Sequence, residues 1–329
     1  KVTEEIMINL TKSIRKEYGI KNLCLAGGVA LNCVANGKIL QEKIFDNIWI
    51  QPAAGDAGGS LGAALALWYS EQKNERVVNS KDDMKGSYLG TDFTQKEIEK
   101  ELKSIGAHYE IFNYDQLIDK TAQFLSEEKA IGWFQGRMEF GPRALGGRSI
   151  LGDPRSDKMQ KNLNLKVKYR ESFRPFAPSV LREDLSTWFD MSVDSPYMLL
   201  VSNINTDKRI EMSEEQKNLF GIDKLNIKRS EIPAVTHVDY SARVQTVTKD
   251  TNSRYYDLIS KFKEKTGCPL VVNTSFNVRG EPIVNSPTDA FNCFMGTELD
   301  YLVIGNCILE KSKQDPNLKK DYTEEFELD

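Results

Sequence analysis

The spacing of apolar positions divides the first part of the chain into short helical and extended segments. Residues 3–18 carry Ile6, Leu10 and Ile14 at four-residue steps, a pattern typical of an amphipathic helix. The runs NLCLAG and FDNIWIQP favour short buried strands, and each precedes a glycine-rich loop that opens a helical pattern, GGVALNCVANGKILQEK and GDAGGSLGAALALWYSEQ. This order predicts an α/β layer with two parallel strands.

Two parallel strands do not make a stable open sheet alone. We therefore expect residues 1–75 to be part of a domain whose remainder lies elsewhere, and a start at Lys1 instead of Met fits a piece of a longer protein. Residues 76–87 are polar and predict a linker, a second domain is expected over 88–312, and the polar residues 313–329 predict a frayed tail.

The second domain alternates helical and strand patterns. Helices are expected at TQKEIEKELKSIG, NYDQLIDKTAQFLSEEK, SRYYDLISKFKEKTG and SPTDAFNCFMGTE. Gly267 should end the third, and Ser286 with Asp289 should cap the fourth. Strands are expected at AIGWFQG, FRPFAPSVL, DSPYMLLVSNI, CPLVVNTSFN and LDYLVIGNCILE, the last as a single strand.

Composition narrows the function classes. A net charge of -4 gives no global electrostatic attraction for DNA or a membrane. The 5 cysteines are widely spaced and are expected to be reduced, and 2 histidines, His108 and His237, exclude a multi-histidine metal site within this chain. No apolar run is long enough to span a bilayer and no signal peptide opens the sequence, so a cytoplasmic location is expected.

A basic stretch, GWFQGRMEFGPRALGGRSILGDPRS, stands out in this acidic chain. Its arginines alternate with Gly141, Pro142, Gly146 and Gly147, which form tight turns and let backbone N–H groups approach a ligand. Arginine presents a rigid fork that matches phosphate and carboxylate oxygens. The stretch, with RESFRPFAPSV after it, predicts a preorganised pocket for a phosphorylated small molecule or nucleotide; charge alone would equally fit a solvated face.

Three shorter segments add candidates. VVNTSFNVRGEPIV places short polar side chains at a strand end, as in ligand-facing loops, although a satisfied turn explains them equally well. Gly27 and Gly28 open a helix whose N-terminus favours an anion. Asp56 precedes another helix, where capping is favoured over contact with a metal or a phosphate.

Taken together, the motifs resemble the O-carbamoyltransferase family, whose members include nodulation protein U and the cephamycin and tobramycin carbamoyltransferases. CLAGGVALN, GDAGGSLGAAL, GWFQGRMEFGPRALGGRSIL, RESFRPFAPSVL and NTSFNVRGEPIV occur here in the family's order. The resemblance implies an α/β fold with part of an actin-like, sugar-kinase-like ATPase-fold domain followed by a YrdC-like α/β domain.

The resemblance also implies a reaction. The YrdC-like domain would form carbamoyl adenylate from carbamoyl phosphate and ATP with Mg2+. The complete first domain, with a divalent metal of the iron type, would pass the carbamoyl group to a hydroxyl of a small molecule or glycan. Asp56 matches the family's metal-ligand aspartate, but its histidine ligands are absent here, so the metal site should be incomplete. Gly147 departs from the larger polar residue expected in relatives.

Site roles are carried over residue by residue. No nucleophilic side chain is needed, because the intermediate is a mixed anhydride. Catalysis is expected of Arg137, Arg143, Arg148, Lys166, Arg170 and Arg174. Binding of substrate or nucleotide is expected of Lys168, Asn273, Ser275, Asn277, Arg279, Gly27, Gly28 and Asn32.

The expected partners are carbamoyl phosphate, ATP, the acceptor and the missing N-terminal part of the same protein, and a homodimer stays open. Two other functions also stay open. One is a threonylcarbamoyl-adenylate synthase of tRNA modification, which would use threonine and bicarbonate. The other is a fragment that binds a nucleotide without catalysis. A sugar kinase is disfavoured, because only half of its fold is expected here.

Overall fold

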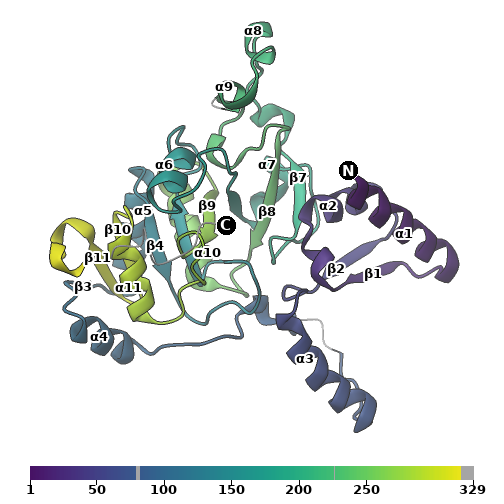
Figure 1. Cartoon of the computed structure of the whole chain (residues 1–329), viewed down its shortest axis with the longest axis horizontal. Coiled ribbons are helices and arrows are strands. Elements are labelled where there is room, and N and C mark those ends of the chain that lie inside the picture. The colour runs from purple at the N-terminus through teal and green to yellow at the C-terminus, as the bar shows by residue number, and fades with distance from the viewer. Residues whose placement is uncertain (79–81, 226, 320–329) are drawn as a thin grey trace.

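The N-terminal segment folds in the helix–strand order that its apolar pattern predicts. The computed structural model describes residues 1–78, 82–225 and 227–319. Strands β1 and β2 pair in parallel with Asn22 opposite Asn47, which confirms the predicted pairing (Figure 1). The elements are α1 (Val2–Tyr18), β1 (Asn22–Leu25), α2 (Cys33–Gln41), β2 (Asn47–Ile50) and α3 (Ala57–Ala66).

Helix α1 is where the sequence predicts it, but it buries a different face. Met7 and Thr11 face the small core of this segment, whereas Ile6 and Leu10 are 60% and 57% exposed. Thr11 can be buried because its hydroxyl donates to the carbonyl oxygens of Met7 and Ile8, both at 2.9 Å. The apolar steps therefore locate the helix but not its packing face.

The remainder of the chain is built on one mixed sheet of nine strands. The order across the sheet is β3-β11-β10-β4-β5-β9-β6-β8-β7, and neighbours are antiparallel except for β10–β4 and β6–β8. The strands are β3 (Glu110–Ile111), β4 (Ile131–Phe134), β5 (Arg148–Gly152), β6 (Ala177–Leu181), β7 (Leu200–Asn203), β8 (Ser241–Val247), β9 (Leu270–Ser275), β10 (Tyr301–Ile304) and β11 (Cys307–Glu310).

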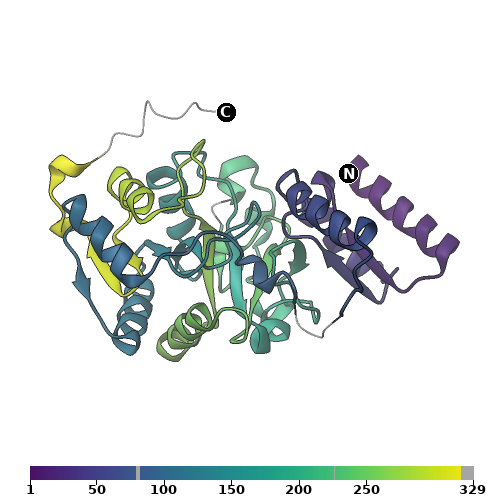
Figure 2. The same cartoon turned by 90° about the horizontal axis from the view of Figure 1, so that it is seen from below.

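Helices cover both faces of this sheet. Helices α5 and α10 pack against each other on one face, and α4 and α11 lie on the other (Figure 2). Gly267 ends α10 in the left-handed region, and Ser286 forms a capping box with Asp289 at the start of α11, as predicted. The bounds are α4 (Gln95–Ser104), α5 (Tyr114–Ser126), α6 (Met159–Lys166), α7 (Leu185–Trp188), α10 (Ser253–Thr266) and α11 (Pro287–Gly296).

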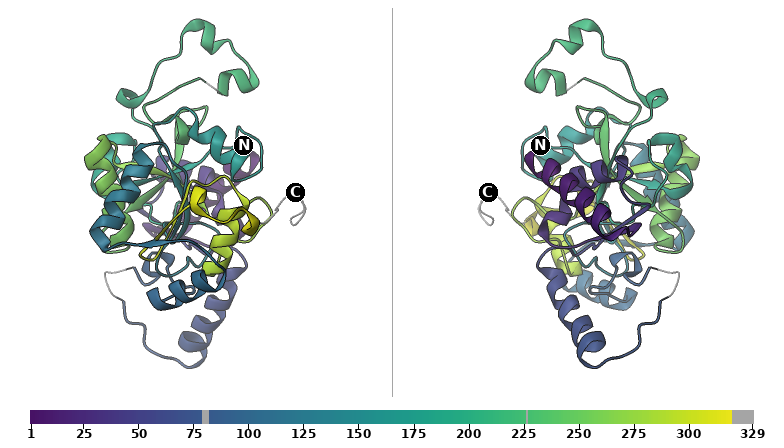
Figure 3. Two further views of the ribbon diagram at one scale, coloured as in Figure 1. Left: turned by 90° about the vertical axis from the view of Figure 1, so that its left-hand side faces the viewer. Right: turned by 90° about the vertical axis from the view of Figure 1, so that its right-hand side faces the viewer.

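Two short helical pieces stand off the sheet at the end opposite α3. These are α8 (Glu214–Lys217) and α9 (Gly221–Leu225), and Figure 3 shows them beyond the edge of the sheet in both views.

The N-terminal segment contacts the large sheet through α2. The side chain of Asn36 donates to the carbonyl oxygen of Leu199 at 3.1 Å. Gly37 lies so close to β7 that a Cβ atom there would be 2.3 Å from the carbonyl oxygen of Val201. Only glycine permits this approach, so the position of α2 on β7 is fixed by sequence.

Helix α3 packs on the rest of the chain only near its start, where Leu61 lies partly buried against the large core. It contains no buried residue, and Leu65, Leu67 and Trp68, at its end and just after it, are 45%, 55% and 52% exposed. In Figure 1 it points away from both sheets. Among the described residues, no helix combines the length and apolar character needed to cross a membrane.

The structure differs from the predicted elements at several places. β5 lies inside the basic stretch that was interpreted as turns, and β3, β8 and the short helices α6 to α9 were not predicted. LDYLVIGNCILE forms the antiparallel hairpin β10–β11 instead of one strand, because the chain reverses at Gly305, whose φ is 53°.

Candidate functional site

Five neighbouring strands bring most of the predicted residues of the large sheet to one end of these strands. We call this end, with the loops that meet there, the basic edge. β4 ends at Phe134, opposite Arg148, where β5 begins. β9 ends at Ser275 beside the start of β5, and β6 begins at Ala177 beside the end of β9. β8 runs parallel to β6, so its start at Ser241 lies at the same edge. The loops that meet there are residues 135–147, 167–176 and 276–286.

Lys168 is the centre of one polar cluster at this edge. Its side chain is 3% exposed. Its ammonium group donates to the Ser275 carbonyl, to Ser275 Oγ at 3.1 Å, and to the carbonyl and Oδ1 of Asn277 at 2.9 and 2.7 Å. Ser275 Oγ donates to Asn277 Oδ1 at 2.6 Å. Burial lowers the pKa of Lys168 to about 7. The structure thus joins three of the predicted binding residues.

Three arginines and two carboxylates, Glu171 and Glu281, lie beside this cluster. Arg174 and Arg279 approach Glu171 at 3.0 and 3.9 Å. Arg170 donates to Asn164 Oδ1 at 2.7 Å, and burial, followed by the charge of Arg174, lowers its pKa to about 10. With Lys168, the positive charges outnumber the two carboxylates, so this part of the edge is suited to an anion.

Arg243, at the start of β8, is a cation that the sequence analysis missed. Burial and then the charge of Arg143 lower its pKa, and Arg170 acts on it as well. Gln245 on the same strand donates to the carbonyl of Leu145 in the loop that carries Arg143, so the two segments lie side by side. The available signal was an arginine inside SARVQTV, an otherwise uncharged run with strand propensity. Arg143, which was predicted, therefore has an unpredicted partner of like charge.

Arg148 is structural, contrary to its predicted catalytic role. It is 0% exposed, and its guanidinium group donates to the carbonyls of Gly136 and Gly147 at 3.0 and 3.2 Å and of Thr91 at 3.3 Å. Its Cζ lies 3.5 Å from the centroid of the Phe134 ring. Both Nη atoms are bonded to backbone carbonyls, and Nε is buried without a partner. Because the side chain is fully buried, Arg148 fixes the loop after β4 and is not accessible to a phosphate.

Asn273, a predicted binding residue, is buried and hydrogen-bonded within the fold. It is fully buried, and its amide donates to the Ala144 carbonyl at 3.1 Å, Ser179 Oγ at 3.0 Å and Gln245 Oε1 at 2.9 Å. Gln245 in turn donates to the Leu145 carbonyl at 2.8 Å. These bonds hold the basic loop against β6 and β8, so Asn273 positions the loop instead of contacting a ligand through its amide.

Glu139 organises the same loop from within. Its carboxylate accepts from the backbone N–H groups of Leu145 at 2.6 Å, Gly147 at 2.7 Å and Arg148 at 3.2 Å. Burial raises the pKa of Glu139 despite these bonds. A Cβ on Gly147 would lie 2.7 Å from the Arg137 carbonyl oxygen and 3.1 Å from Glu139 Oε1. The loop of this chain therefore requires glycine at a position where we expected a larger polar residue in relatives.

Arg137 and Lys166, two further predicted cations, lie in different parts of the molecule. Arg137 is exposed at the site edge and donates to the Gly90 carbonyl at 3.0 Å. Lys166 pairs with Glu298 at 2.9 Å and lines a small cavity with Asp300, directly before β10, which is the opposite end of the strands. The structure therefore does not bring the Lys166 side chain together with the other candidates, because it pairs with Glu298 while the Lys168 side chain reaches Ser275 and Asn277.

The N-terminal candidates form a separate group. Gly27 has a φ of 89° and, like Gly28, is exposed. Asn32 accepts from the Ala35 N–H at 3.2 Å and caps α2. Asp56 makes no capping bond because its own backbone is already helical, so the capping expectation was wrong. Within residues 1–78, 82–225 and 227–319, no three His, Cys, Asp or Glu side chains are grouped to hold a metal.

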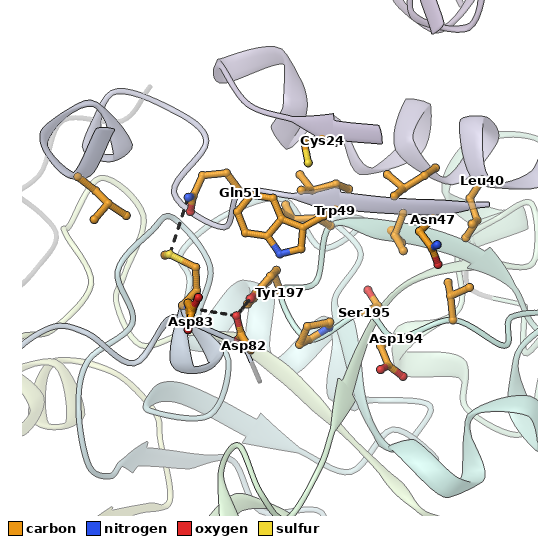
Figure 4. Close-up of a pocket in the computed structure, with 18 of the residues that line it drawn as sticks. Cys24, Leu40, Asn47, Trp49, Gln51, Asp82, Asp83, Asp194, Ser195 and Tyr197 are labelled. Carbon is orange, nitrogen blue, oxygen red and sulfur yellow. Dashed lines mark hydrogen bonds between the residues drawn. The ribbon is translucent and has the colours of Figure 1, made fainter. Parts of the chain in front are cut away.

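A large cavity lies between the two parts of the chain, away from the basic edge. Its volume is about 1470 Å³, and no predicted site residue lines it. Figure 4 shows the Trp49 indole projecting from β2 toward Tyr197 and Asp82, whose side chains are joined by a bond of 2.6 Å. Asp194 and its partner Arg182 also line the cavity.

Comparison with known sequences decides the family. Residues 122–311 match the family described as carbamoyltransferase C-terminus, and residues 1–65 match carbamoyltransferase N-terminus. The chain belongs to the carbamoyltransferase family. This confirms the resemblance drawn from the motifs, and it makes the basic edge part of a region matched by the C-terminal family.

The relatives of this carbamoyltransferase chain are longer than it is. It is 57% identical to the uncharacterized protein sll1178 of Synechocystis over 100% of the chain and 54% of that protein. It is 42% identical to nodulation protein NolO of Bradyrhizobium diazoefficiens over 94% of the chain and 53% of that protein. The chain thus spans about half the length of these curated relatives.

One solved structure also resembles the chain at a low level. The crystal structure of full-length HypF in its phosphate- and nucleotide-bound form aligns with a TM-score of 0.38 and 16% identity, covering 62% of this chain and 23% of HypF. A likeness this weak carries no argument about fold or ligand.

Proposed function

We propose that the basic edge of the large sheet forms carbamoyl adenylate for transfer to a hydroxyl-bearing acceptor. Carbamoyl phosphate, ATP and water would give carbamoyl adenylate, pyrophosphate and phosphate. The mixed anhydride needs no covalent bond to the protein. Its formation does require that two polyanions be held together, which fixed cations and hydrogen-bond donors favour.

The observation that carries the proposal is the meeting of cations at one sheet edge within a carbamoyltransferase family chain. Neighbouring strands bring Lys168, Arg170, Arg174 and Arg279 together with the side chains of Ser275 and Asn277. A cluster of like charge costs folding free energy unless an anion is bound. A site for phosphoryl groups explains why the fold tolerates it.

We assign roles by position. Lys168 holds the Ser275 and Asn277 side chains in place and faces the phosphates. Arg143, Arg170, Arg174 and Arg279 neutralise charge on carbamoyl phosphate and ATP, and Arg137 at the exposed rim attracts them. Mg2+ would enter with ATP as the counter-ion of its phosphates, so it requires no dedicated protein ligands.

The transfer step is assigned to the whole protein. Asp56 stands in no group of three metal-binding side chains among the described residues, so these residues do not fit a divalent metal of the iron type. The apolar residues exposed on α1 and α3 suit cover by further parts of a longer protein, in keeping with relatives about twice as long.

The experiment that tests the proposal is the release of pyrophosphate from ATP and Mg2+. We expect release to depend on carbamoyl phosphate and to be accompanied by an equal amount of phosphate. A parallel assay replaces carbamoyl phosphate with threonine and bicarbonate. Release only in that assay would assign the chain to threonylcarbamoyl-adenylate synthesis, and binding of ATP without release in either would leave a nucleotide-binding fragment.

A further inference from the structure

Arg143 and Arg243 meet where the basic edge contacts the N-terminal segment. Gln245, two residues after Arg243 on β8, donates to the carbonyl of Leu145, two residues after Arg143. This bond lays the loop that carries Arg143 along the strand that carries Arg243. Both side chains therefore reach the same side of the junction, and the charge of Arg143 contributes to lowering the pKa of Arg243.

The N-terminal segment closes this spot from the other side. Val201 of β7 pairs with Arg243 and lies directly against Gly37 of α2. Cys33, the first residue of α2, is close enough to affect the pKa of both guanidinium groups. The pair is thus enclosed by the loop, the strand and the start of α2, which come from both parts of the chain.

These two cations have no carboxylate partner among the described residues. Neither appears in an ion pair closer than 4.0 Å, and the Nε atoms of Arg143 and Arg243 are both buried without a hydrogen-bond acceptor. Both arginines are partly buried, and guanidinium groups of like charge gathered in such a place cost free energy that a bound anion would offset. By contrast, Arg155 in the same basic stretch pairs with Asp153 at 2.6 Å.

We propose that Arg143 and Arg243 form an anion subsite, closed by the start of α2, that takes a phosphoryl group. The planar fork of each arginine matches phosphate oxygens, and a dianion would satisfy both Nε donors at once. Because loop, strand and α2 all border the subsite, a bound phosphoryl group ties the N-terminal segment to the large sheet. Its occupation by carbamoyl phosphate or an adenylate, in place of free phosphate, rests on the proposed function.

Thermal unfolding with added anions tests the subsite without turnover. In chloride-free buffer, inorganic phosphate, AMP and carbamoyl phosphate are compared as the stabilising ligand. We expect at least one to raise the melting temperature of the wild-type chain, and Arg143→Gln or Arg243→Gln to weaken its affinity about tenfold or more. Arg182→Gln is the control, since this arginine pairs with Asp194 at the far end of β6 and its loss should leave the affinity unchanged.

A second readout follows from the position of Cys33. In a Cys24→Ser background, Cys33 is the remaining cysteine that is not buried, so its alkylation rate reports on the junction. The stabilising anion should slow this alkylation in the wild-type arginine background and not in Arg243→Gln. If Arg243→Gln fails to fold, Arg243→Lys, which keeps the charge and loses the fork, is measured instead.

The outcomes separate this inference from the proposed function. Full anion stabilisation in Arg143→Gln or Arg243→Gln, or no stabilisation of the wild-type chain by any of the three anions, would overturn the subsite. The chain could also be stabilised by an anion, lose this stabilisation in the variants, and release no pyrophosphate. That result would support the subsite and contradict the proposed reaction.

Discussion

At the scale of single residues, Lys168 shows how burial sets up an anion site. Its ammonium group is enclosed by oxygen atoms of Ser275 and Asn277, yet burial still lowers its pKa to about 7. The charge of Arg170 acts in the same direction, while Glu281 acts against it. A bound phosphate would restore the charged form, since a negative neighbour favours the ammonium.

This predicts a pH dependence of nucleotide binding. As the pH rises through 7, the free site loses the Lys168 proton, and binding of ATP must then take one up. Affinity for ATP should fall by up to about tenfold per pH unit between pH 7 and 9. Calorimetric titration of the wild-type chain and of Lys168→Met measures it, and an equal pH dependence in both would contradict this role for Lys168.

Glu139 gives a second prediction at this scale. Glu139→Ala would leave the N–H groups of Leu145, Gly147 and Arg148 without their acceptor inside the fold. We expect a loss of about 3 kcal/mol or more in the free energy of unfolding, because each buried donor left unpaired costs about 1–3 kcal/mol. Urea denaturation measures the loss; a change below about 1 kcal/mol would show that the loop does not depend on Glu139.

At the scale of elements, long periodic segments were predictable, whereas several short ones were not. The inward stripe of α5, Leu117, Ile118, Ala122 and Leu125, is buried as its spacing indicates. β5 was missed because only three small or apolar residues stand between Arg148 and Gly152, and arginine and glycine are typical of turns. In the structure Arg148 is buried against the ring of Phe134. Local pattern cannot reveal a strand whose charged residue is satisfied by distant carbonyls.

The candidate site follows the same division. The sequence indicated Lys168, Ser275 and Asn277, and the structure joins them. The sequence did not show that Lys166 lies apart from Lys168, because both belong to one basic run. Only their side-chain partners in the structure distinguish the two lysines. Arg243 was missed because it lies about a hundred residues from Arg143 in the chain, and only the pairing of β6 with β8 brings it close.

Helix α3 yields a prediction that concerns a whole element. Leu67 and Trp68 follow α3 and are more than half exposed, so they contribute little to folding of this chain. The free energy of unfolding of the double variant Leu67→Ser, Trp68→Ser should lie within about 0.5 kcal/mol of the wild-type value. Guanidinium denaturation monitored by circular dichroism tests this; destabilisation beyond about 1 kcal/mol would mean that α3 is packed in solution.

At the scale of the whole molecule, the fold gathers cations from segments far apart in the sequence. The large sheet presents one edge at which five strands begin or end, and the N-terminal segment docks beside it through α2. The chain is acidic overall, with a net charge of -4, so this group of cations is a local feature of the molecule. In a carbamoyltransferase family chain, this arrangement favours chemistry on carbamoyl phosphate and ATP.

The most direct test of this account compares two lysines in one assay. Carbamoyl phosphate-dependent pyrophosphate release is measured for Lys168→Met and for Lys166→Ala, which differ by two positions in the chain but lie at different ends of the strands. The account predicts that Lys168→Met reduces release by about a hundredfold or more, as expected for loss of a positioned charge, while Lys166→Ala stays near the wild-type rate. Comparable release by both variants, or a loss confined to Lys166→Ala, would contradict it.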